Sequence, residues 1–436
     1  MRIAEYPRRH RRWSIATTAL MTVCLVAGRQ PSALAAEKAA VAVAASNGPI
    51  LLDREGPAKP WRIVKDLDVL TGGSQIIGSV GATVDSMNGA VRASMVGDVA
   101  GLSPFPILET SFLIETAKDV DFAFMMDRGR IDLINRKASG AAKIKVTVRG
   151  KSAILTLPDP GDRVALEIYG RWMKGQRFIK SPKGKHEPGL ALLLIAIKGE
   201  VYVKGPTRTL GVKAPPGPAL MLVDDIEDTE PDIQWLDKLP AWVDASDPEI
   251  KKKVAATTNR FKELAGKKSI AEALSEMVVS EDKMDRRGAV VILGATDELK
   301  QLAEAMIATK YDDVWDNGVI VLRNWIGRGP GQDMKLYNAM IEAKIPEADA
   351  EVIMQLLHSF SDAELRKPAL YQALLDYLDN DRLAIRGLAH WHLVRLVPDG
   401  RKIEYNIHGS KEDRAIGAKA WRDLIPPGTL PGQPKK

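Results

Sequence analysis

The sequence predicts a multidomain α and β protein, with an N-terminal all-β domain of sandwich or jelly-roll type and a C-terminal α-α superhelix. Two features of the chain indicate this division. Between residues 48 and 223, short apolar runs alternate with Gly, Pro, Asn and Asp at a spacing of about ten residues, which is typical of short strands joined by turns. From about residue 246 the composition becomes helical, and one helical phrase recurs, as in an α-solenoid built of helix pairs.

Residues 1–36 have the layout of a secretory signal peptide. A basic segment precedes an apolar run of 15 residues, Ser14–Gly28, and small residues follow around 33–35, as a cleavage site requires. The run is shorter than the ~20 residues that span a bilayer. We therefore expect an exported protein, periplasmic or extracellular, without stable membrane insertion after cleavage. An uncleaved signal anchor is the alternative. Cys24 lacks the small residues of a lipoprotein cleavage site, so no lipid anchor is expected.

Removal of residues 1–36 changes the charge of the protein. The full chain carries a formal charge of +6, but these residues hold six arginines and one glutamate, which leaves +1 on the remainder. A nearly neutral protein has no general reason to bind phosphate backbones, so nucleic acid is not an expected partner. Cys24 is the single cysteine. The remaining chain therefore has no disulfide, thiolate nucleophile or cysteine metal site.

The all-β domain is predicted over 48–223, after a small-residue linker at 37–47. KIKVTVRG at 143–150 and RVALEIYG at 163–170 alternate apolar and polar residues, as half-buried strands do. Asn88-Gly89 predicts a hairpin turn with two positive φ angles. The candidate strands lie at 49–52, 74–84, 90–96, 111–117, 121–126, 130–134, 143–150, 152–157, 163–172, 190–197 and 200–205.

An acidic, proline-flanked segment at 224–245 is predicted to join the two domains. It carries six Asp and Glu residues between positions 224 and 232 on few apolar residues, which favours a solvated linker. Carboxylates also bind hard cations, but the spacing of a calcium-binding loop is absent. We therefore predict a linker and no metal site here.

The helical domain is predicted over 246–425, followed by a Pro/Gly-rich tail at 426–436. Its first helix, 246–266, has Ser246 or Asp247 as its cap, Pro248 in the first turn and Gly266 at its end. Related helical phrases lie at 285–295, 315–325, 384–394 and 414–424, and 348–360 supplies an apolar helix between them. Each phrase has a glycine inside it, at Gly288, Gly318, Gly387 and Gly417. Because glycine destabilises a helix interior, we expect each one to allow close approach of a neighbouring helix.

The phrase at 379–396 resembles a HEAT-type repeat. Asp379 or Asp381, the pair Ile385-Arg386, Ala389 and Leu393 match the family phrase. The resemblance extends over about 247–425, although an earlier copy has Asn317 where the family has arginine. It implies a HEAT-like solenoid.

The segments 66–91 and 126–172 resemble a FecR-type periplasmic domain, through Thr71-Gly72 and Gly129-Arg130-Ile131. Together with the HEAT-like half, the layout looks like exported proteins of planctomycete-type bacteria. The resemblance implies signal perception or scaffolding at the cell envelope through protein–protein contact. Only about 13 residues precede the apolar run, so the sigma-factor segment of FecR regulators is not expected.

Two groups of residues are candidate binding sites. Alternation places Glu167, Tyr169 and Arg171 on one strand face, with Trp172 beside them; an ordinary outer sheet face is the alternative. The Gly/Pro segment RNWIGRGPGQ at 323–332 is expected to be a loop, which in a solenoid is often part of the binding face. Its candidate binding residues are Arg323, Trp325 and Arg328. A simple connector is the alternative there.

No catalytic residue, cofactor or metal is predicted. The sequence contains no G-x-S-x-G, H-E-x-x-H or phosphate-binding-loop motif. His390 and His392 lie on a predicted helix, where positions i and i+2 point to opposite sides and cannot share one metal. The sequence therefore favours a non-enzymatic exported protein that binds a protein partner or ligand at the cell envelope. The alternatives are a carbohydrate-binding or carbohydrate-processing β domain, in which Tyr169 and Trp172 stack on a glycan, and a purely structural envelope protein.

Overall fold

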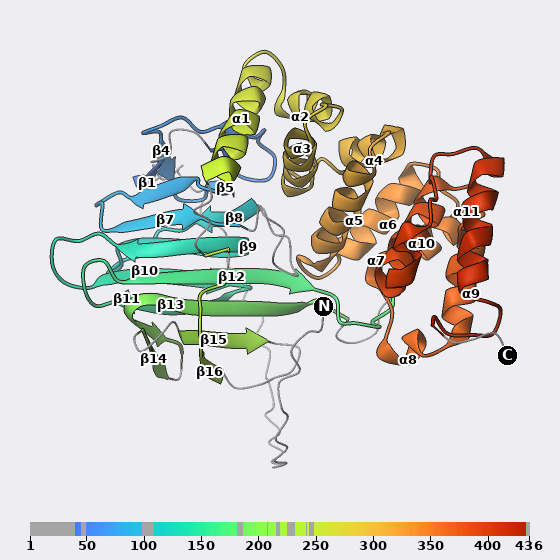
Figure 1. Cartoon of the computed structure of the whole chain (residues 1–436). Coiled ribbons are helices and arrows are strands. Elements are labelled where there is room, and N and C mark those ends of the chain that lie inside the picture. Colours follow the sequence, from blue (N-terminus) through green and yellow to red (C-terminus); the bar gives the residue numbers. More distant parts are fainter. Residues whose placement is uncertain are drawn as a thin grey trace, which may run out of the picture. The chain divides into compact units, whose positions relative to one another are not determined.

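The computed structural model describes residues 40–44, 49–97, 109–180, 186–206, 208–214, 219–224, 232–240, 242–243 and 248–432. Strands come first and helices follow (Figure 1). The described residues belong to one compact unit that begins at Ala39. The predicted signal peptide at 1–36 lies outside the described residues. Within the described part of the chain, no helix is long and apolar enough to cross a membrane.

Sixteen strands are present in the described residues. They are β1 (Ala40–Ala44), β2 (Leu51–Arg54), β3 (Arg62–Ile63), β4 (Val69–Thr71), β5 (Gln75–Ser79), β6 (Thr83–Ser86), β7 (Val91–Met95), β8 (Glu109–Ile114), β9 (Phe122–Asn135), β10 (Ala142–Val148), β11 (Lys151–Leu157), β12 (Arg163–Arg171), β13 (Gly189–Lys204), β14 (Thr209–Ala214), β15 (Ala219–Asp224) and β16 (Asp232–Trp235). The predicted β-rich region is confirmed.

The strands pair in two sheets that share β9 and β13. One sheet has the order β4-β1-β6-β7-β9-β12-β13-β15-β16. The other has the order β3-β2-β5-β8-β9-β10-β11-β13-β14. Because the shared strands pair in both, β9, β10, β11, β13 and β12 form a closed five-stranded barrel, with the other strands added to it. Only β9 and β10 pair in parallel among these strands.

Two glycines with positive φ lie inside the long shared strands. In β9, residues before Gly129 pair with β10, and residues from Gly129 onward pair with β12. Gly129 has φ +101°. In β13, residues up to Lys198 pair with β12, and residues from Gly199, with φ +73°, pair with β14. These conformations suit glycine because it has no Cβ, and they let one strand change sheets. The prediction of separate strands at 121–126 and 130–134, and at 190–197 and 200–205, is therefore wrong.

Both segments predicted as linkers contain strands. β1 lies within 37–47 and pairs with β4 and β6. β16 lies within 224–245 and pairs with β15, and Trp242 and Val243 pack against Ala165 and Ile195. The predicted hairpin at Asn88-Gly89 joins β6 and β7, but only Gly89 has a positive φ, of +68°. Asn88 instead accepts a hydrogen bond through its side chain from the N–H of Ala90.

Eleven α-helices follow in the described residues. They are α1 (Pro248–Ala265), α2 (Ile270–Val278), α3 (Lys283–Ala295), α4 (Leu299–Ala308), α5 (Asp312–Gly327), α6 (Gln332–Glu342), α7 (Glu347–His358), α8 (Asp362–Leu365), α9 (Pro368–Tyr377), α10 (Leu383–Leu396) and α11 (Lys411–Leu424), with a short 3₁₀ helix, η1 (Pro398–Lys402), between the last two. The predicted helix at 246–266 is α1, and the four recurring phrases lie in α3, α5, α10 and α11.

The recurring glycines allow close packing, as predicted, but not always against a helix. A Cβ added to Gly318 would lie 2.5 Å from Met306 of α4, and one on Gly288 would lie 3.3 Å from Thr257 of α1. A Cβ on Gly387 would overlap the ring of Trp315, which comes from α5. At Gly417 the neighbour is the segment 404–405, which is not a helix.

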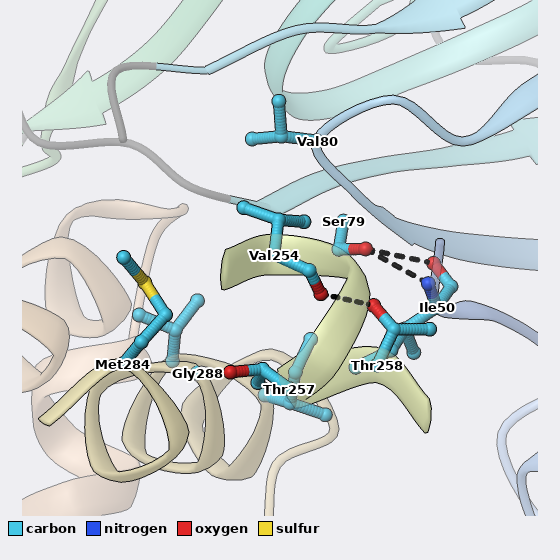
Figure 2. A pocket seen from close by; sticks show the side chains of 10 residues that line it. Ile50, Ser79, Val80, Val254, Thr257, Thr258, Met284 and Gly288 are labelled. Carbon is cyan, nitrogen blue, oxygen red and sulfur yellow. Dashed lines mark hydrogen bonds between the residues drawn. The ribbon is translucent and has the colours of Figure 1, made fainter. Parts of the chain in front are cut away.

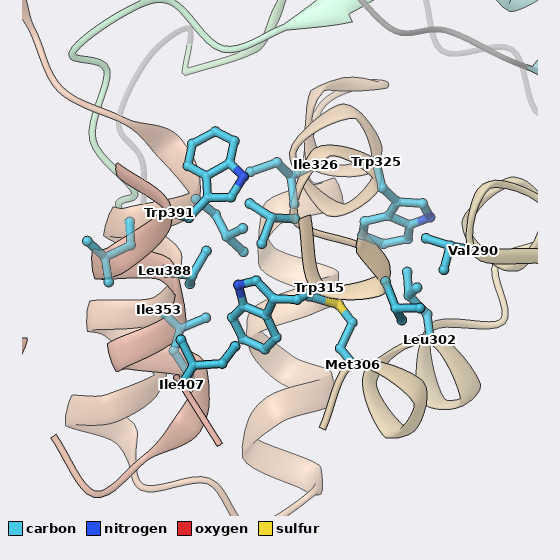
Figure 3. Packing of buried hydrophobic residues seen from close by; sticks show 14 of the residues in the cluster. Val290, Leu302, Met306, Trp315, Trp325, Ile326, Ile353, Leu388, Trp391 and Ile407 are labelled. Atoms are coloured by element: carbon cyan, nitrogen blue, oxygen red, sulfur yellow. The ribbon is translucent and has the colours of Figure 1, made fainter. Parts of the chain in front are cut away.

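The helices and strands share one hydrophobic cluster. Ile50, Leu52 and Ile77 of the strand region belong to the same buried cluster as the helix interiors, and so does Phe178 from the segment after β12. Figure 3 shows the centre of this cluster, where Trp315, Trp325 and Trp391 pack among aliphatic side chains. A second cluster fills the space between the strands.

Candidate functional site

The first predicted site, on β12, does not form an open surface. Glu167 is 3% exposed, and the guanidinium group of Arg130 donates to both of its carboxylate oxygens, at 3.0 and 3.3 Å. The same guanidinium lies 4.7 Å from the ring centroid of Trp242. The expectation of an exposed Glu167 is therefore wrong. β12 is a central strand between β9 and β13, and the segment around Trp242 covers this face. Tyr169 and Arg171 are half-buried on the same strand.

Trp172 contacts the helices. Its indole N–H donates to the carbonyl of Ile326 at 3.0 Å. Its ring lies 4.9 Å from the ring of His186 and 4.5 Å from the ring of His358. Of the two aromatic residues named for a glycan platform, Trp172 thus contacts the helical region and Tyr169 is half-buried.

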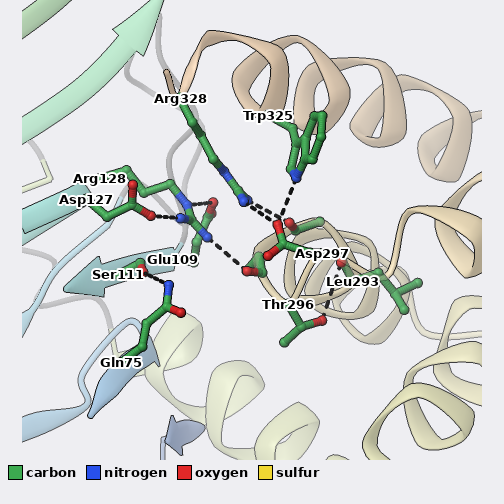
Figure 4. A network of polar contacts seen from close by, with 12 residues as sticks. Gln75, Glu109, Ser111, Asp127, Arg128, Leu293, Thr296, Asp297, Trp325 and Arg328 are labelled. Carbon is green, nitrogen blue, oxygen red and sulfur yellow. Dashed lines mark hydrogen bonds and ion pairs between the residues drawn. The ribbon is translucent and has the colours of Figure 1, made fainter. Parts of the chain in front are cut away.

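The second predicted site is also internal. Residues 323–327, expected to be a loop, form the last turns of α5. Arg323 donates to the carbonyl of Leu357 at 2.7 Å, and burial lowers its pKa to about 10. Trp325 donates through its indole to Asp297 at 2.9 Å. Arg328 donates to the same carboxylate at 2.8 Å and to the carbonyl of Gly294 at 2.6 Å (Figure 4).

The two predicted groups meet at one internal interface. Besides the bond from Trp172 to Ile326, Arg149 donates to the carbonyl of Arg328 at 3.4 Å. Gly170 and Gly327 approach so closely that a Cβ on either one would clash with the main chain of the other. Of the predicted residues, Trp172 and Arg328 thus contribute to the contact between strands and helices. Glu167 pairs with the neighbouring strand β9, and Arg323 and Trp325 bond within the helical region.

A small apolar cavity lies between the strands and α1. It has a volume of about 60 Å³ and is lined by Ile50, Val80, Val254 and Ile292, among others (Figure 2). Its hydroxyl groups already have partners: Ser79 bonds to the main chain of Ile50, and Thr258 bonds to the carbonyl of Val254. This cavity is well below the volume of usual small-molecule sites.

A larger groove lies in the helical region and is the candidate functional site. It has a volume of about 540 Å³, within the range of small-molecule sites. The start of α5, the end of α10 and the segment after η1 line it. The lining residues are Lys310, Asp312, Trp315, Asp316, His390, Trp391, Val394, Arg395, Arg401, Ile403, Glu404, Tyr405, Asn406 and Ile407. We call these residues the α5–α10 groove.

Among the described residues, no ion pair joins the charged side chains of the groove to one another. Asp316 and Arg395 influence each other's pKa, but no ion pair joins them among the described residues. Partial burial raises the pKa of Asp316 and lowers the pKa of Arg395, although both side chains remain exposed to solvent at the groove. Two neighbouring groups also act on them: Asp312 raises the pKa of Asp316, and Arg401 lowers the pKa of Arg395.

Both arginines of the groove are held by main-chain carbonyls of α10. Arg395 donates to the carbonyl of Trp391 at 3.2 Å, and its guanidinium carbon lies 3.7 Å from the Trp391 ring centroid. Arg401 donates to the carbonyl of Val394 at 3.4 Å. These contacts hold each guanidinium group in place, and each group still has N–H donors beyond them, because arginine carries five.

The floor of the groove contains buried polar atoms. His390 packs 4.9 Å from the ring of Tyr405, and burial lowers its pKa to about 4, so it is neutral at pH 7. Its Nε2 atom and the indole N–H groups of Trp315 and Trp391 have no hydrogen-bond partner among the described residues. Buried polar groups normally have one. In the sequence, His390 and its neighbour Trp391 were considered only in asking whether His390 and His392 could bind a metal ion.

His392 points to the other side of α10, as predicted. It lies 4% exposed, and its Nε2 bonds the carbonyl of Leu356 at 2.7 Å. Within the described residues, no three His, Cys, Asp or Glu side chains are grouped so that they could hold a metal ion. No protein-family model, curated protein or solved structure matches the chain. The α5–α10 groove is therefore the feature from which a function is argued.

Proposed function

We propose that this chain is a non-enzymatic exported protein of the cell envelope that recognises a partner or ligand through the α5–α10 groove. The observation that supports the proposal is the set of charged side chains in the groove that are not paired with one another. Three basic and three acidic residues line it. Such groups lose solvation in a concave site and regain electrostatic partners when a complementary molecule binds.

The finer fold assignment is part of this proposal. We infer a FecR-like sandwich for the strands and a HEAT-like solenoid for the helices. Support for the first comes from the two rows of strands that extend from β9 outside the barrel, one through β7 and one through β8, whose side chains share one buried cluster. Support for the second comes from glycines at matching places in α3, α5 and α10. In such proteins recognition surfaces are built from helix pairs. The α5–α10 groove likewise lies between two helices.

The alternative of a glycan-binding β domain has less support. It depended on Tyr169 and Trp172 as a stacking platform, but Trp172 donates to a helix carbonyl and packs against two histidine rings, and Tyr169 is half-buried. The groove offers charged groups and few open aromatic faces, since Trp315 and Trp391 are 5% and 9% exposed. Recognition of a charged partner fits this lining better.

Fractionation and intact mass test the exported location. We expect a chain that lacks about the first 35 residues, in the soluble exported fraction of the host cell. Full-length chain in the membrane fraction would support the signal anchor. Full-length chain in the cytoplasm would contradict the proposal.

Partner capture from envelope extract tests the groove. We expect Arg401→Glu to abolish capture of any stoichiometric partner, because the reversal removes one of the three basic groups of the groove and adds a fourth acidic group. Lys402→Glu is the matched control, since Lys402 is the next residue, is exposed and does not line the groove. Equal loss in both variants, or no loss in either, would contradict recognition through the groove.

A further inference from the structure

The charge pattern of the α5–α10 groove indicates the chemistry of its ligand. Its acidic groups on α5, Asp312 and Asp316, are one turn apart and lie on the same side of the helix. Its arginines, Arg395 and Arg401, come from the end of α10 and from η1. The groove therefore has an acidic wall and a basic wall. Lys310 and Glu404 complete a lining whose formal charge is zero, with His390 neutral.

The basic wall suits a carboxylate. Arg395 and Arg401 both line the groove. Among the described residues no carboxylate lies within ion-pair distance of either, although Asp316 acts on Arg395 from farther away. Guanidinium groups bind carboxylates with paired, charge-assisted hydrogen bonds. The carbonyl groups that hold each guanidinium group also reduce the entropy lost when an anion is bound.

The acidic wall suits an ammonium group. Partial burial and the neighbouring charge of Asp312 raise the pKa of Asp316, and Arg395 lowers it from a distance beyond that of an ion pair. A bound cation would add to the effect of Arg395. Lys310 does not serve this purpose, because its ammonium group lies 3.7 Å from Glu281 and over the ring of Tyr311. A simple anion would leave this wall without a partner, and a simple cation would leave the arginines without one.

We infer that the α5–α10 groove binds a zwitterionic short peptide, with its C-terminal carboxylate on Arg395 and Arg401 and its N-terminal ammonium group on Asp312 and Asp316. This inference rests on the proposed function and names the ligand class of the same site. A groove of about 540 Å³ accommodates a peptide of a few residues. Main-chain carbonyl groups of the peptide, or waters bound to them, would face the floor that contains Trp315 and Trp391.

Titration calorimetry with three forms of tri-alanine tests the inference on the purified full-length chain. We expect the peptide with both termini free to bind. The N-acetylated and C-amidated forms should each bind roughly tenfold more weakly or worse, because each loses one charge-assisted contact. If the N-acetylated form binds as well as the free peptide, the acidic wall has no role and the inference is wrong. If none of the three binds, it is also wrong.

Two variants connect the binding to the two walls. Arg401→Gln should weaken binding of the free peptide roughly tenfold and remove the penalty of C-amidation. Asp316→Asn should also weaken binding of the free peptide roughly tenfold, and it should remove the penalty of N-acetylation. Lys402→Gln is the control and should bind as the unmodified chain does. Thermal unfolding of each variant verifies its fold. If tri-alanine fails while partner capture still depends on Arg401, the peptide inference falls and the proposed function stands.

Discussion

Several conspicuous polar side chains use their hydrogen-bond donors on main-chain carbonyls far away in the sequence. Trp172 donates to Ile326, Arg323 to Leu357 and Arg386 to Ile407. Such side chains combine large apolar area with a polar group that must be satisfied when buried. In a single sequence they have the same appearance as ligand-binding residues. The carbonyl that each one meets is set by the tertiary fold.

His392 is another buried polar side chain, and its burial should make the stability of the protein depend on pH. Burial lowers its pKa from about 6.5 to about 3, so the folded protein keeps it neutral in a range where the unfolded chain binds a proton. The free energy of unfolding therefore falls as the pH drops below about 6.5, by up to roughly 1.4 kcal/mol per pH unit for this residue. Below a pH of about 3 both states are protonated and the loss is complete. Urea unfolding between pH 7 and 4.5 measures the slope.

His392→Gln isolates this contribution. The amide can donate to the carbonyl of Leu356 but does not titrate, so the pH dependence should decrease by the share of one histidine. His390, with a pKa of about 4, contributes in the same direction and remains in the variant. An unchanged slope would mean that His392 titrates normally in the folded protein.

At the scale of elements, the sequence predicted what local pattern determines. Helix positions follow from composition, caps and stops, and Pro248 and Gly266 bracket α1 as expected. The two long strands were located but each was divided, because Gly129 and Gly199 look like turn residues. Whether a glycine with positive φ ends a strand or bends it depends on the neighbouring strands. The segment 74–84 was predicted as one strand but contains β5 and β6, and six strands were missed: β1, β3, β4, β14, β15 and β16. β1 and β16 lie in small-residue and acidic segments, where short runs carry little signal.

Substitution of Gly129 tests the bend in β9. A Cβ at Gly129 would lie 2.5 Å from the carbonyl oxygen of Glu109, and φ is +101°. We expect Gly129→Ala to lower the free energy of unfolding by about 3 kcal/mol, because backbone strain of roughly 1–3 kcal/mol is added to a main-chain clash. Denaturant unfolding followed by circular dichroism measures the change.

Gly89→Ala is the matched control for this prediction. Gly89 also has a positive φ, of +68°, but nothing lies within 4 Å of the position that a Cβ would take. Only the conformational penalty applies there, about 1 kcal/mol. Equal effects of the two substitutions would show that crowding at the bend is unimportant.

The groove could not be predicted from the sequence for a reason that belongs to the whole molecule. Its walls come from residues near 312, 395 and 401, and no local pattern indicates that these segments meet. The contacts between strands and helices could not be predicted from the sequence for the same reason. The segment that follows β12, residues 172–180, reaches the helices through ion pairs of Lys174 with Asp362 and of Lys180 with Glu347. Opposite charges separated by more than 160 positions carry no pairing signal in one sequence.

Phe178 connects this segment to the helical core, and its removal should affect the whole molecule. The side chain is 5% exposed, its ring lies 5.2 Å from that of Tyr337, and its carbonyl accepts a bond from Gln355 at 2.8 Å. Because strands and helices share one hydrophobic cluster, we expect the unmodified chain to unfold in a single transition. Phe178→Ala should lower the free energy of unfolding by about 3–5 kcal/mol.

Circular dichroism and tryptophan fluorescence, followed together during urea unfolding, test both parts of this expectation. The two signals should coincide in the unmodified chain, since a shared core couples the loss of strands to the loss of helices. Ile179→Ala is the control, because Ile179 is the next residue and is 47% exposed, so its loss should cost less than about 1 kcal/mol. Separate transitions in the unmodified chain would contradict the coupling. Equal effects of the two substitutions would show that Phe178 does not connect the segment to the core.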